Sequence, residues 1–393
     1  MKGVTILGST GTIGVNTLDV IAQHESEFKV VALTANKNAT LMAEQCTRWQ
    51  PHYAVMCDAD AAETLRQKLE ITAPDTKVLF GQENLKFVSS LPEIASVMAG
   101  IVGAAGLLPT LAAAYAGKRV MLANKEALVM SGQLFMDAIN ENGAELLPID
   151  SEHNAIFQCM PHDFNNNIVE SGITRILLTA SGGPFRTRDI DTLGAVTPAE
   201  ACAHPNWVMG QKISVDSATM MNKGLEIIEA CWLFGTHHSS IEVVIHPQSV
   251  IHSMVEYTDG SVLAQLGNPD MRTPIAYALN WPKRIASGVE RLNLFDIKRL
   301  DFEPPNESRF PLLRIAREAM ERGETATTIM NAANEVLVAA FLNGTVRFTD
   351  IPVLIEQTLS QASIRSADSI ENILAADNDA RATVLEQIKS CAA

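Results

Sequence analysis

The chain has 393 residues and a formal net charge of −15, and 47% of its residues are hydrophobic. This length predicts two or three domains with sizeable cores. The acidic balance argues against nucleic acid or an anionic membrane surface as the main partner, because either would repel the chain. An anionic substrate would need a site that is locally basic or loaded with metal.

The six cysteines are scattered along the chain, and no two are spaced as C-x-x-C. This spacing indicates neither a zinc site nor a disulfide framework, so we expect reduced thiols. There is no signal-peptide layout and no run of ~18 apolar residues. A cytoplasmic protein that does not cross a membrane is therefore expected.

The start of the chain predicts a strand, a glycine-rich turn, a helix and a second strand. Apolar runs at 4–7 and 30–33 flank the turn GSTGTIG, residues 8–14. Glycines let the backbone approach a pyrophosphate, and the helix N-terminus offers donors to it. The spacing is G-x-x-G-x-x-G, which a plain tight turn would also explain, but the flanking strands and helix favour dinucleotide binding.

The end of the second strand indicates which dinucleotide is bound. Residues 35–38 include no acid that could hold a free ribose 2′-hydroxyl, and they do include Lys37. Because a cation suits a 2′-phosphate, we infer NADP, although an ordinary exposed lysine would look the same.

Further apolar runs alternate with helical stretches and predict a largely parallel sheet. These runs lie at 53–57, 78–80, 95–99, 120–122 and 146–149. Asn124, Lys125 and Glu126 follow one of them, at the edge where ligands bind in open α/β sheets. A helix capped by Asn124 is the alternative explanation for this tripeptide.

Two carboxylates follow the run at 146–149. Asp150 and Glu152 are two residues apart, and in an extended chain such residues point to the same side. We therefore expect them to converge just past a strand end, where their repulsion calls for a cation or a proton between them. Oxygen ligands suit a hard ion such as Mg²⁺ or Mn²⁺. A solvated acidic turn is the alternative.

A possible phosphate-binding turn and a long loop come next. After a strand predicted at 176–179, the turn Ser181-Gly182-Gly183 offers backbone donors and a hydroxyl, which suit a phosphate or a plain loop. Residues 185–211 show little periodicity, and loops of this length are often active-site lids. Within them, HPNWVMG (204–210) carries a histidine and a tryptophan, which could instead serve local packing.

A helix is predicted over 222–234, after SVDSAT at 214–219. At 100° per residue its apolar side chains fill one side, and Asn222, Lys223, Glu226 and Glu229 lie in the opposite arc. A charged solvent face would look the same. In a cleft, either glutamate could be a third metal ligand while the amide and the ammonium hold an anion.

The rest of the chain carries less chemistry. Runs at 249–257 and 261–266 flank Asp259-Gly260 and predict a hairpin. Both of its faces are apolar, so we expect the sheet to be covered on both sides, for example by a partner subunit. Helical periodicity then appears at 312–322, 326–342, 351–362 and 380–390, where Asn331, Asn334 and Glu335 are expected to be packing and capping groups.

Several motifs together make the chain resemble one family. They are GSTGTIG, ANKEAL, PIDSEHNAIFQ, SGGPF, HPNWVMG, SVDSATMMNKGLE, HPQSVIHSMV and NPDMRTPIAYAL, and they span essentially the whole chain. In combination they are similar to the 1-deoxy-D-xylulose 5-phosphate reductoisomerases. These are NADPH- and metal-dependent enzymes of non-mevalonate isoprenoid synthesis, which make 2-C-methyl-D-erythritol 4-phosphate.

The resemblance implies roles for individual residues. NADPH contacts are implied at Thr10, Gly11, Thr12, Ile13, Asn36, Lys37, Asn38, Asn124, Glu126 and Gly210. Metal ligands are implied at Asp150, Glu152 and Glu226, which favours Glu226 over Glu229. Substrate contacts are implied at Lys125, Ser151, Glu152, Ser181, His204, Ser217, Asn222, Lys223 and Glu226, with Ser181, Ser217, Asn222 and Lys223 near the phosphate. The catalytic set is Lys125, Asp150, Glu152, His204 and Glu226, and Trp207 and Met209 match a flexible flap. The family often has glycine at Asn36; Asn tolerates positive φ, so we expect the turn to be kept.

The expected fold is α/β: an NADPH-binding Rossmann-like domain, a central α+β catalytic domain and a C-terminal helical domain. Their expected bounds are 1–150, 151–285 with a flexible lid at 185–211, a connector at 286–311, and 312–393. The implied cofactors are NADPH and Mg²⁺ or Mn²⁺, with Co²⁺ as a further candidate. The implied partners are a small phosphorylated sugar and a second subunit in a homodimer. A metal-independent NADP dehydrogenase of a semialdehyde is the rival function.

Overall fold

The computed structural model describes residues 1–207 and 209–392, with side chains described to residue 390. Val208, which belongs to the HPNWVMG motif and to the expected lid, lies outside the described residues. Contacts divide the chain into two compact units. The first comprises residues 1–127, 135–154 and 270–290, and the second comprises 128–134, 155–269 and 291–393. The units are thus interleaved along the sequence, whereas we expected consecutive domains.

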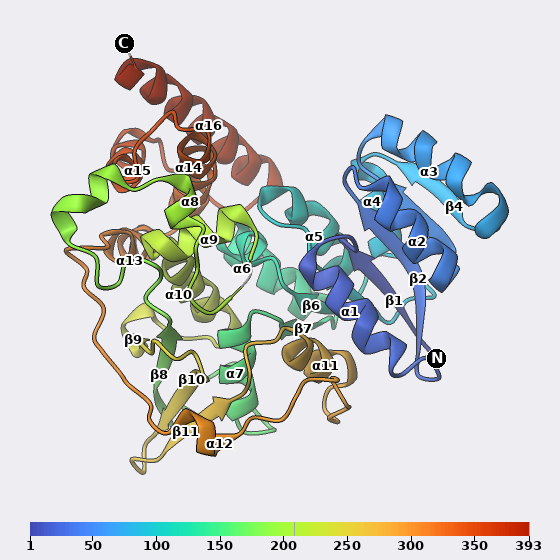
Figure 1. The fold of residues 1–393 in the computed structure, drawn as a ribbon, viewed down its shortest axis with the longest axis horizontal. Helices are drawn as coiled ribbons and strands as arrows, with labels where there is room; N and C mark the ends of the chain where they lie inside the picture. Colours follow the sequence, from blue (N-terminus) through green and yellow to red (C-terminus); the bar gives the residue numbers. More distant parts are fainter. Residues whose placement is uncertain (208, 393) are drawn as a thin grey trace. The chain divides into compact units, whose positions relative to one another are not determined.

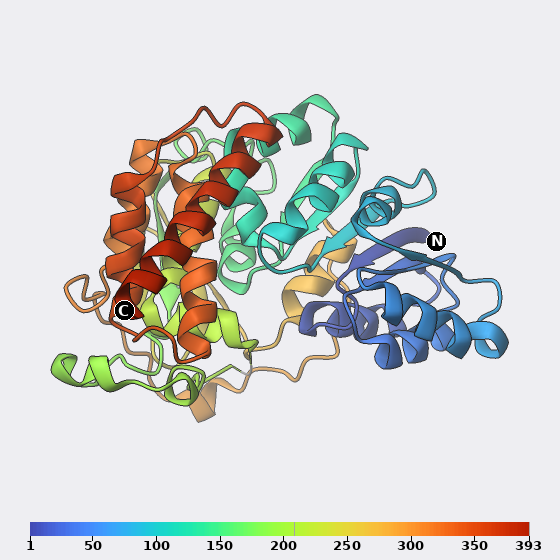
Figure 2. The ribbon, with the colours of Figure 1, turned by 90° about the horizontal axis from the view of Figure 1, so that it is seen from above.

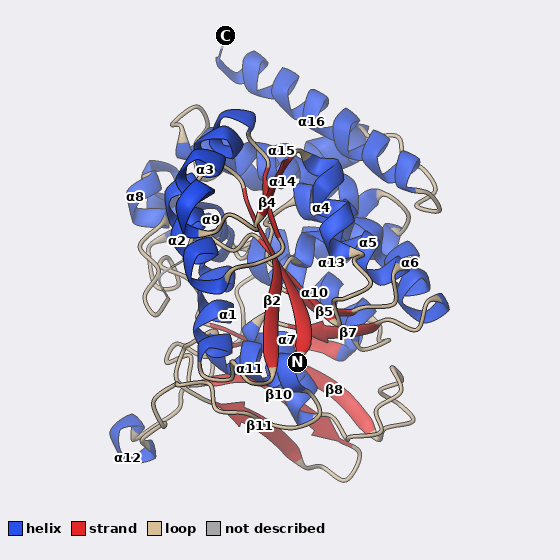
Figure 3. Cartoon of the chain, turned by 90° about the vertical axis from the view of Figure 1, so that its right-hand side faces the viewer, coloured by secondary structure: helices blue, strands red, loops and turns tan. Residues whose placement is uncertain are grey.

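The first unit is built on a seven-stranded parallel sheet with the order β4-β3-β2-β1-β5-β6-β7 (Figures 1 and 3). The strands are β1 (Lys2–Leu7), β2 (Phe28–Ala35), β3 (Tyr53–Met56), β4 (Lys77–Phe80), β5 (Ser96–Ala99), β6 (Arg119–Leu122) and β7 (Glu145–Pro148). The connecting helices are α1 (Thr12–Ala22), α2 (Ala39–Trp49), α3 (Ala59–Thr72), α4 (Gln82–Ser89), α5 (Leu107–Tyr115) and α6 (Lys125–Glu141), with a 3₁₀ turn η1 at Ala104–Gly106. The central strands are buried almost throughout, which explains why they appear in the sequence as continuous apolar runs.

The strand order reverses between β1 and β5, and this is where an open parallel sheet binds its ligand. The loops that leave these two strands lie against each other. A Cβ added at Gly8, whose φ is +78°, would lie 2.9 Å from the carbonyl oxygen of Gly100. The glycines therefore allow a close approach of two backbones at the expected cofactor site.

Residues 270–290 return to the first unit after the central sheet. They contain α11 (Arg272–Asn280). The Arg272 guanidinium lies 3.0 Å from Asp19 of α1, and Arg119 of β6 donates to the carbonyl oxygens of Leu279 and Trp281. These polar contacts tie a segment distant in sequence onto the parallel sheet.

The second unit contains a mixed four-stranded sheet with the order β11-β10-β8-β9. Its strands are β8 (Ile173–Ala180), β9 (Ile241–Ile245), β10 (Ile251–Tyr257) and β11 (Val262–Leu266). Only β8 and β9 are parallel. The expected hairpin is confirmed as β10 and β11, with Gly260 in its turn at φ +85°. In the single chain Val262 and Leu263 of β11 are about half exposed, so the expectation that both faces are covered stays a prediction that depends on a partner.

Helices account for most of the second unit, and Figure 2 shows those of the C-terminal part lying side by side. They are α7 (Ser151–Cys159, which begins in the first unit), α8 (Pro198–Ala201), α9 (Gln211–Thr219), α10 (Met221–Leu233), α12 (Leu294–Ile297), α13 (Leu312–Arg322), α14 (Ala326–Leu342), α15 (Asp350–Gln361) and α16 (Ile370–Ala392), with 3₁₀ turns η2 (Ile190–Ala195) and η3 (His238–Ser240). One apolar cluster joins side chains from the sheet, from α9 and α10 and from the C-terminal helices. The C-terminal helices thus share a core with the central sheet. In the described residues, no helix is both long and apolar enough to cross a membrane.

The α/β fold with a parallel sheet and a helical C-terminal part is confirmed, but some local predictions are wrong. Residues 185–211 are not structureless, because η2 and α8 lie within them. Asp189 caps η2, and Thr197 and Glu200 form a capping box on α8, signals that punctuate a segment without long periodicity. Residues 214–219, expected to precede a helix, lie themselves in the helix α9, and Met220 at φ +64° separates it from α10.

Candidate functional site

The glycine-rich turn after β1 leads directly into α1. Gly11 is the N-cap residue, and no side chain caps this helix end. A Cβ at Gly14 would lie 2.3 Å from the Cα of Ser9, so the first turn of α1 packs against the loop backbone. Thr10 and Ile13 are half-buried, whereas Gly11 and Thr12 are exposed. An uncapped helix start beside an exposed glycine turn is suited to a phosphate group.

The 2′-phosphate of NADP was expected at the residues that follow β2. The Lys37 side chain is 76% exposed, and its ammonium lies 3.9 Å from Asp58. Asn38 caps α2 by accepting a hydrogen bond from the Leu41 amide, 3.1 Å away. Asn36 lies in a bend but does not have positive φ, so the tolerance of Asn for that conformation is not what preserves this turn.

Asn124, Lys125 and Glu126 are all buried at the start of α6. The Asn124 side chain accepts from the Ala127 amide at 3.0 Å and donates to the carbonyl oxygens of Ile101 and Gly103, in the loop after β5. It therefore serves as a helix cap and also connects two loops at the carboxyl edge of the sheet. The Lys125 ammonium forms an ion pair with Asp150.

Asp150 and Glu152 do converge, but not by the geometry we expected. Asp150 lies just after β7, whereas Glu152 is in the first turn of α7, so the chain is not extended between them. Their carboxylate oxygens lie within 4.8 Å of each other. Helix α7 begins at Ser151, and the Asn154 side chain fastens this start by donating to the Pro148 carbonyl oxygen at 2.8 Å. The first turn of α7 thus brings the two carboxylates together, as an extended chain would have done.

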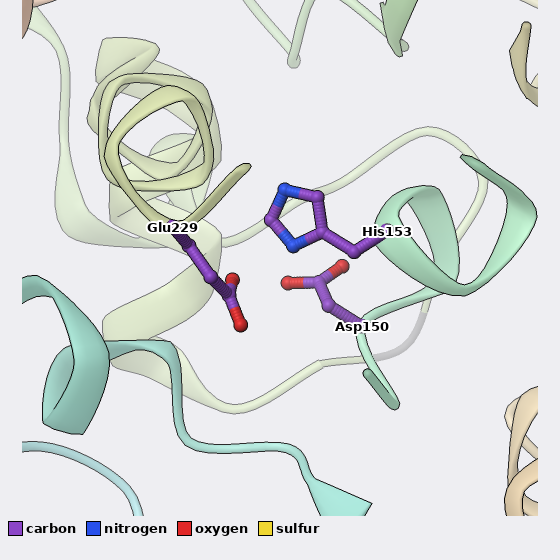
Figure 4. Close-up of side chains that lie close together, drawn as sticks. All are labelled: Asp150, His153 and Glu229. Carbon is purple, nitrogen blue, oxygen red and sulfur yellow. The ribbon is translucent and has the colours of Figure 1, made fainter. Parts of the chain in front are cut away.

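His153 is a residue of this cluster that the sequence analysis did not single out. It is fully buried, and a ring nitrogen lies within 4.8 Å of an Asp150 carboxylate oxygen. Figure 4 shows the two side chains where β7 passes into α7, and it also draws Glu229 of α10. A spacing of three residues between an aspartate and a histidine at a helix start could have indicated from the sequence that the two side chains lie close together.

In the second unit, the turn after β8 packs against α9. Gly182 and Gly183 have φ of +85° and +69°, and a Cβ at Gly183 would lie 2.7 Å from the Ser217 carbonyl oxygen. Only glycine leaves room for this approach of the turn to the backbone of Ser217. The turn that begins with Ser181 therefore packs, through Gly183, against the part of α9 that carries Ser217.

His204 holds the second half of the long loop. Its Nε2 lies 2.9 Å from the Ser181 hydroxyl, and its Nδ1 accepts from the amides of Asn206 and Trp207 at 3.2 and 3.0 Å. The Asn206 side chain donates to the Pro247 carbonyl oxygen and to the Ser249 hydroxyl, each at 2.8 Å. Asn206 was not among the expected site residues.

The long loop has two different halves. Phe185, Leu193 and Ala201 are buried, and Arg309 donates to the carbonyl oxygens of Phe185 and Arg186. Residues 204–210, which we call the lid tip, have no regular structure where described. Gly210 ends the tip as the N-cap of α9, with open space where a Cβ would lie.

Helix α10 is buried on its charged side as well as its apolar side. Lys223 is 3% exposed, and Glu226 and Glu229 are fully buried, so this is not a charged solvent face. The Lys223 ammonium and the Asn222 amide both donate to the Glu226 carboxylate. Buried charges persist in proteins when they are paired or bind ions, so this arc is suited to a ligand site. Burial does not distinguish Glu226 from Glu229 as a ligand.

The groups expected to pack in the C-terminal helices do so. Asn334 donates to buried Asp216 of α9 at 2.8 Å, and Asn331 lies 3.2 Å from Glu335. Glu335 also forms an ion pair with Arg381 of α16. These polar side chains thus connect α14 with α9 and with α16.

Comparison with known proteins identifies the family. Three domain models match: 1-deoxy-D-xylulose 5-phosphate reductoisomerase over residues 4–132, its C-terminal domain over 146–234, and DXP reductoisomerase C-terminal domain over 266–383. The chain is 61% identical to a 1-deoxy-D-xylulose 5-phosphate reductoisomerase of Nitrosomonas europaea, over 98% of this chain and 93% of that protein. It is 60% identical to one of Nitrosococcus oceani, over 99% of each.

Solved structures agree. The enzyme of Zymomonas mobilis in complex with NADPH has a TM-score of 0.91 and 45% identity, covering 98% of each chain. A DOX-P reductoisomerase in complex with NADPH, fosmidomycin and magnesium has a TM-score of 0.94 and 45% identity, covering 99% of this chain and 98% of that one. With matches over nearly its whole length in sequence and in fold, this chain belongs to the 1-deoxy-D-xylulose 5-phosphate reductoisomerase family.

Proposed function

We propose that this chain converts 1-deoxy-D-xylulose 5-phosphate to 2-C-methyl-D-erythritol 4-phosphate, with NADPH and a divalent metal ion, in isoprenoid precursor synthesis. Family membership supports the reaction. The structural observation that supports this reaction most strongly is the buried polar arc of α10, where Lys223 and Asn222 contact a fully buried Glu226.

Asp150, Glu152 and Glu226 are the proposed metal ligands. Their chemistry fits the group, because three carboxylates provide the hard oxygen donors that Mg²⁺ and Mn²⁺ prefer. The carboxylates of Asp150 and Glu226 each form an ion pair with a lysine ammonium, which indicates that both need a positive charge beside them. A bound ion would act as a Lewis acid on the oxygens of the substrate.

An ion at these carboxylates would release the lysines for the substrate. Lys125 would then be free to hold a substrate oxygen while Ser151, next to Asp150, donates a hydroxyl proton. On α10, Lys223 and Asn222 are the proposed phosphate ligands, together with Ser181 and Ser217. An ammonium and several neutral donors are suited to hold a phosphate dianion.

The proposed NADPH site is the carboxyl edge of the parallel sheet. Residues 10–13 would hold the pyrophosphate at the start of α1, and Lys37 would hold the 2′-phosphate, with Asn36 and Asn38 in the same turn. Asn124, Glu126 and Gly210 complete the proposed contacts. NADPH supplies the hydride, and the protein supplies orientation and exclusion of water.

The proposed lid is narrower than the segment expected from sequence. The half with η2 and α8 is packed, so we assign closure to the lid tip, residues 204–210. His204 already touches Ser181 and organises the backbone of the tip, so it would orient the substrate as the tip closes. Trp207 and Met209, both half-buried, would cover the substrate and exclude water.

The test of the function is turnover of 1-deoxy-D-xylulose 5-phosphate, followed as NADPH oxidation and by NMR of the product. We expect 2-C-methyl-D-erythritol 4-phosphate with Mn²⁺ or Mg²⁺, and no turnover after chelation until metal is restored. Metal-independent NADPH oxidation with a semialdehyde would instead favour the rival dehydrogenase. That rival has no need for carboxylates at positions 150, 152 and 226.

We also propose a homodimer and a cytoplasmic location. β11 is an edge strand, and Val262, Leu263 and Leu266 expose apolar surface there. A shallow hollow of about 260 Å³ adjoins it, lined by Leu266, Leu294, Ile297, Lys298, Arg299 and Leu300. A second copy would cover this surface. Light scattering should give twice the chain mass, and Leu263→Lys should reduce the measured mass.

The proposed cytoplasmic location is compatible with the thiols. The described cysteines are all free, and reduced thiols are typical of a reducing compartment.

A further inference from the structure

Helix α6 is interrupted in its middle. Gly132 has φ 17° and ψ −95°, so the element consists of two helical halves joined at a kink. The first half carries Lys125 and Glu126 at its start and is capped by Asn124. Residues 128–134 group with the second unit, whereas both ends of α6 group with the first. The kink therefore lies in the part of α6 that belongs to the second unit.

Side chains of the second unit hold the kink. A Cβ at Gly132 would lie 2.4 Å from two ring carbons of Trp232 on α10, so the indole lies directly against the glycine backbone. In a regular helix, the carbonyl oxygens of Val129 and Met130 would bond to residues 133 and 134, beyond the kink. Here the buried hydroxyls of Thr327 and Thr328 on α14 donate to those two oxygens, at 2.7 and 2.8 Å.

We propose that Gly132, Trp232, Thr327 and Thr328 form a positioning joint, which fixes the direction of the first half of α6 and hence the places of Asn124, Lys125 and Glu126. The proposal rests on the proposed function for the roles of those three residues. None of the four joint residues is expected to touch the substrate, NADPH or metal; each acts through α6.

The distance from the kink to the start of α6 is long enough for a small change in helix direction to displace the residues there. Gly132 and Lys125 are seven residues apart, which is about 10 Å of helix at ~1.5 Å per residue. A change of about 6° in the direction of this segment would move the start of α6 by about 1 Å. Misplacement of a catalytic group by about 1 Å can lower turnover by up to ~100-fold. A small repacking at the joint should therefore be visible in kinetics.

The decisive variants change one hydroxyl at a time. Thr328→Val removes the donor to Met130 while keeping the shape, and Thr328→Ser keeps the donor. Thr358→Val is the matched control, because the Thr358 hydroxyl is equally buried and donates to the Leu354 carbonyl oxygen at 2.7 Å, on α15. Losing either hydroxyl should lower the apparent Tm by about 3 °C, because a buried side-chain hydrogen bond is lost.

At 25 °C, we expect Thr328→Val to reduce kcat/KM by about tenfold and to weaken NADPH binding, with Thr328→Ser within about twofold of wild type. Thr358→Val should keep wild-type kinetics despite its lower Tm. Gly132→Ala should behave like Thr328→Val, and a second change, Trp232→Leu, should restore part of the loss by making room for the methyl group.

If Thr328→Val and Thr358→Val both lower Tm and both keep wild-type kinetics, the joint is only structural and the proposal is wrong. The NADPH dissociation constant, measured by nucleotide fluorescence, does not depend on turnover. If wild type fails to convert 1-deoxy-D-xylulose 5-phosphate, the proposed function fails, while the fluorescence comparison still tests the joint. Equal NADPH affinity in wild type and Thr328→Val would then overturn the joint separately.

Discussion

Replacing Lys37 with alanine should distinguish NADPH from NADH. The Lys37 side chain is 76% exposed, and Asp58, its nearest carboxylate, is 3.9 Å away. An exposed pair of this kind stabilises the fold by about 0–1 kcal/mol, so the variant should keep its structure. A charge-assisted bond to a 2′-phosphate, in contrast, contributes roughly 1.5–3 kcal/mol.

At ~1.36 kcal/mol per tenfold, that contribution is worth about 10- to 150-fold in affinity. Solvent exposure of Lys37 favours the lower end. We therefore expect Lys37→Ala to raise the KM for NADPH at least about tenfold and to change the KM for NADH little. Both constants come from initial rates of cofactor oxidation with saturating substrate and Mn²⁺.

Asp58→Asn is the matched control. It removes the competing charge near Lys37, and asparagine can still cap α3 as Asp58 does through the Ala61 amide. NADPH should bind this variant as well as it binds wild type, or slightly better. If Lys37→Ala weakens NADPH and NADH equally, the reasoning is refuted and the 2′-phosphate lies elsewhere.

Three further predictions concern the second unit and the thiols. Substrate should slow proteolysis within the lid tip and change Trp207 fluorescence, and His204→Ala should lower kcat/KM without lowering Tm; equal cleavage with and without ligand would exclude a lid. Burial raises the pKa of the Cys231 thiol to about 12, so iodoacetamide at pH 8 should label exposed Cys57 and spare Cys231 until the chain unfolds; equal labelling would contradict its burial. Burial lowers the pKa of His238 in the folded chain. As the pH falls, this histidine therefore takes up a proton in the unfolded chain at a higher pH than in the folded chain. The free energy of unfolding should therefore fall as pH drops through about 6.5, and less steeply in His238→Gln; identical slopes would show that His238 does not contribute.

The parallel sheet was predictable because its central strands are buried on both faces and therefore appear as continuous apolar runs. Val30–Leu33 and Val120–Leu122 both lie within observed strands, β2 and β6. Strand β9 was missed, although Ile241–Ile245 is mostly apolar and Gly235 breaks the chain between it and α10, because a run of five residues is too short to show a clear period. Helices α13 and α14 have the bounds that periodicity predicted.

The site was predictable in chemistry more than in geometry. Asp150 and Glu152 were recognised as a pair, yet the turn that unites them begins a helix, which an apolar–polar pattern of only nine residues did not reveal. The burial of Glu226 could not be predicted, since an amphipathic pattern does not say whether its polar arc meets water or other groups. Asn206 was missed because its side chain contacts residues more than forty positions away.

The most direct test of the proposed metal site is Mn²⁺ binding followed by electron paramagnetic resonance of the free ion. The variants are Asp150→Asn, Glu226→Gln and, as a matched control on the same helix, Glu229→Gln. We predict one tight Mn²⁺ per chain in wild type and in Glu229→Gln, and at least about tenfold weaker binding in the other two, because each loses an anionic ligand. Tight stoichiometric binding that survives both Asp150→Asn and Glu226→Gln, or that is lost only in Glu229→Gln, would contradict the proposed ligand set.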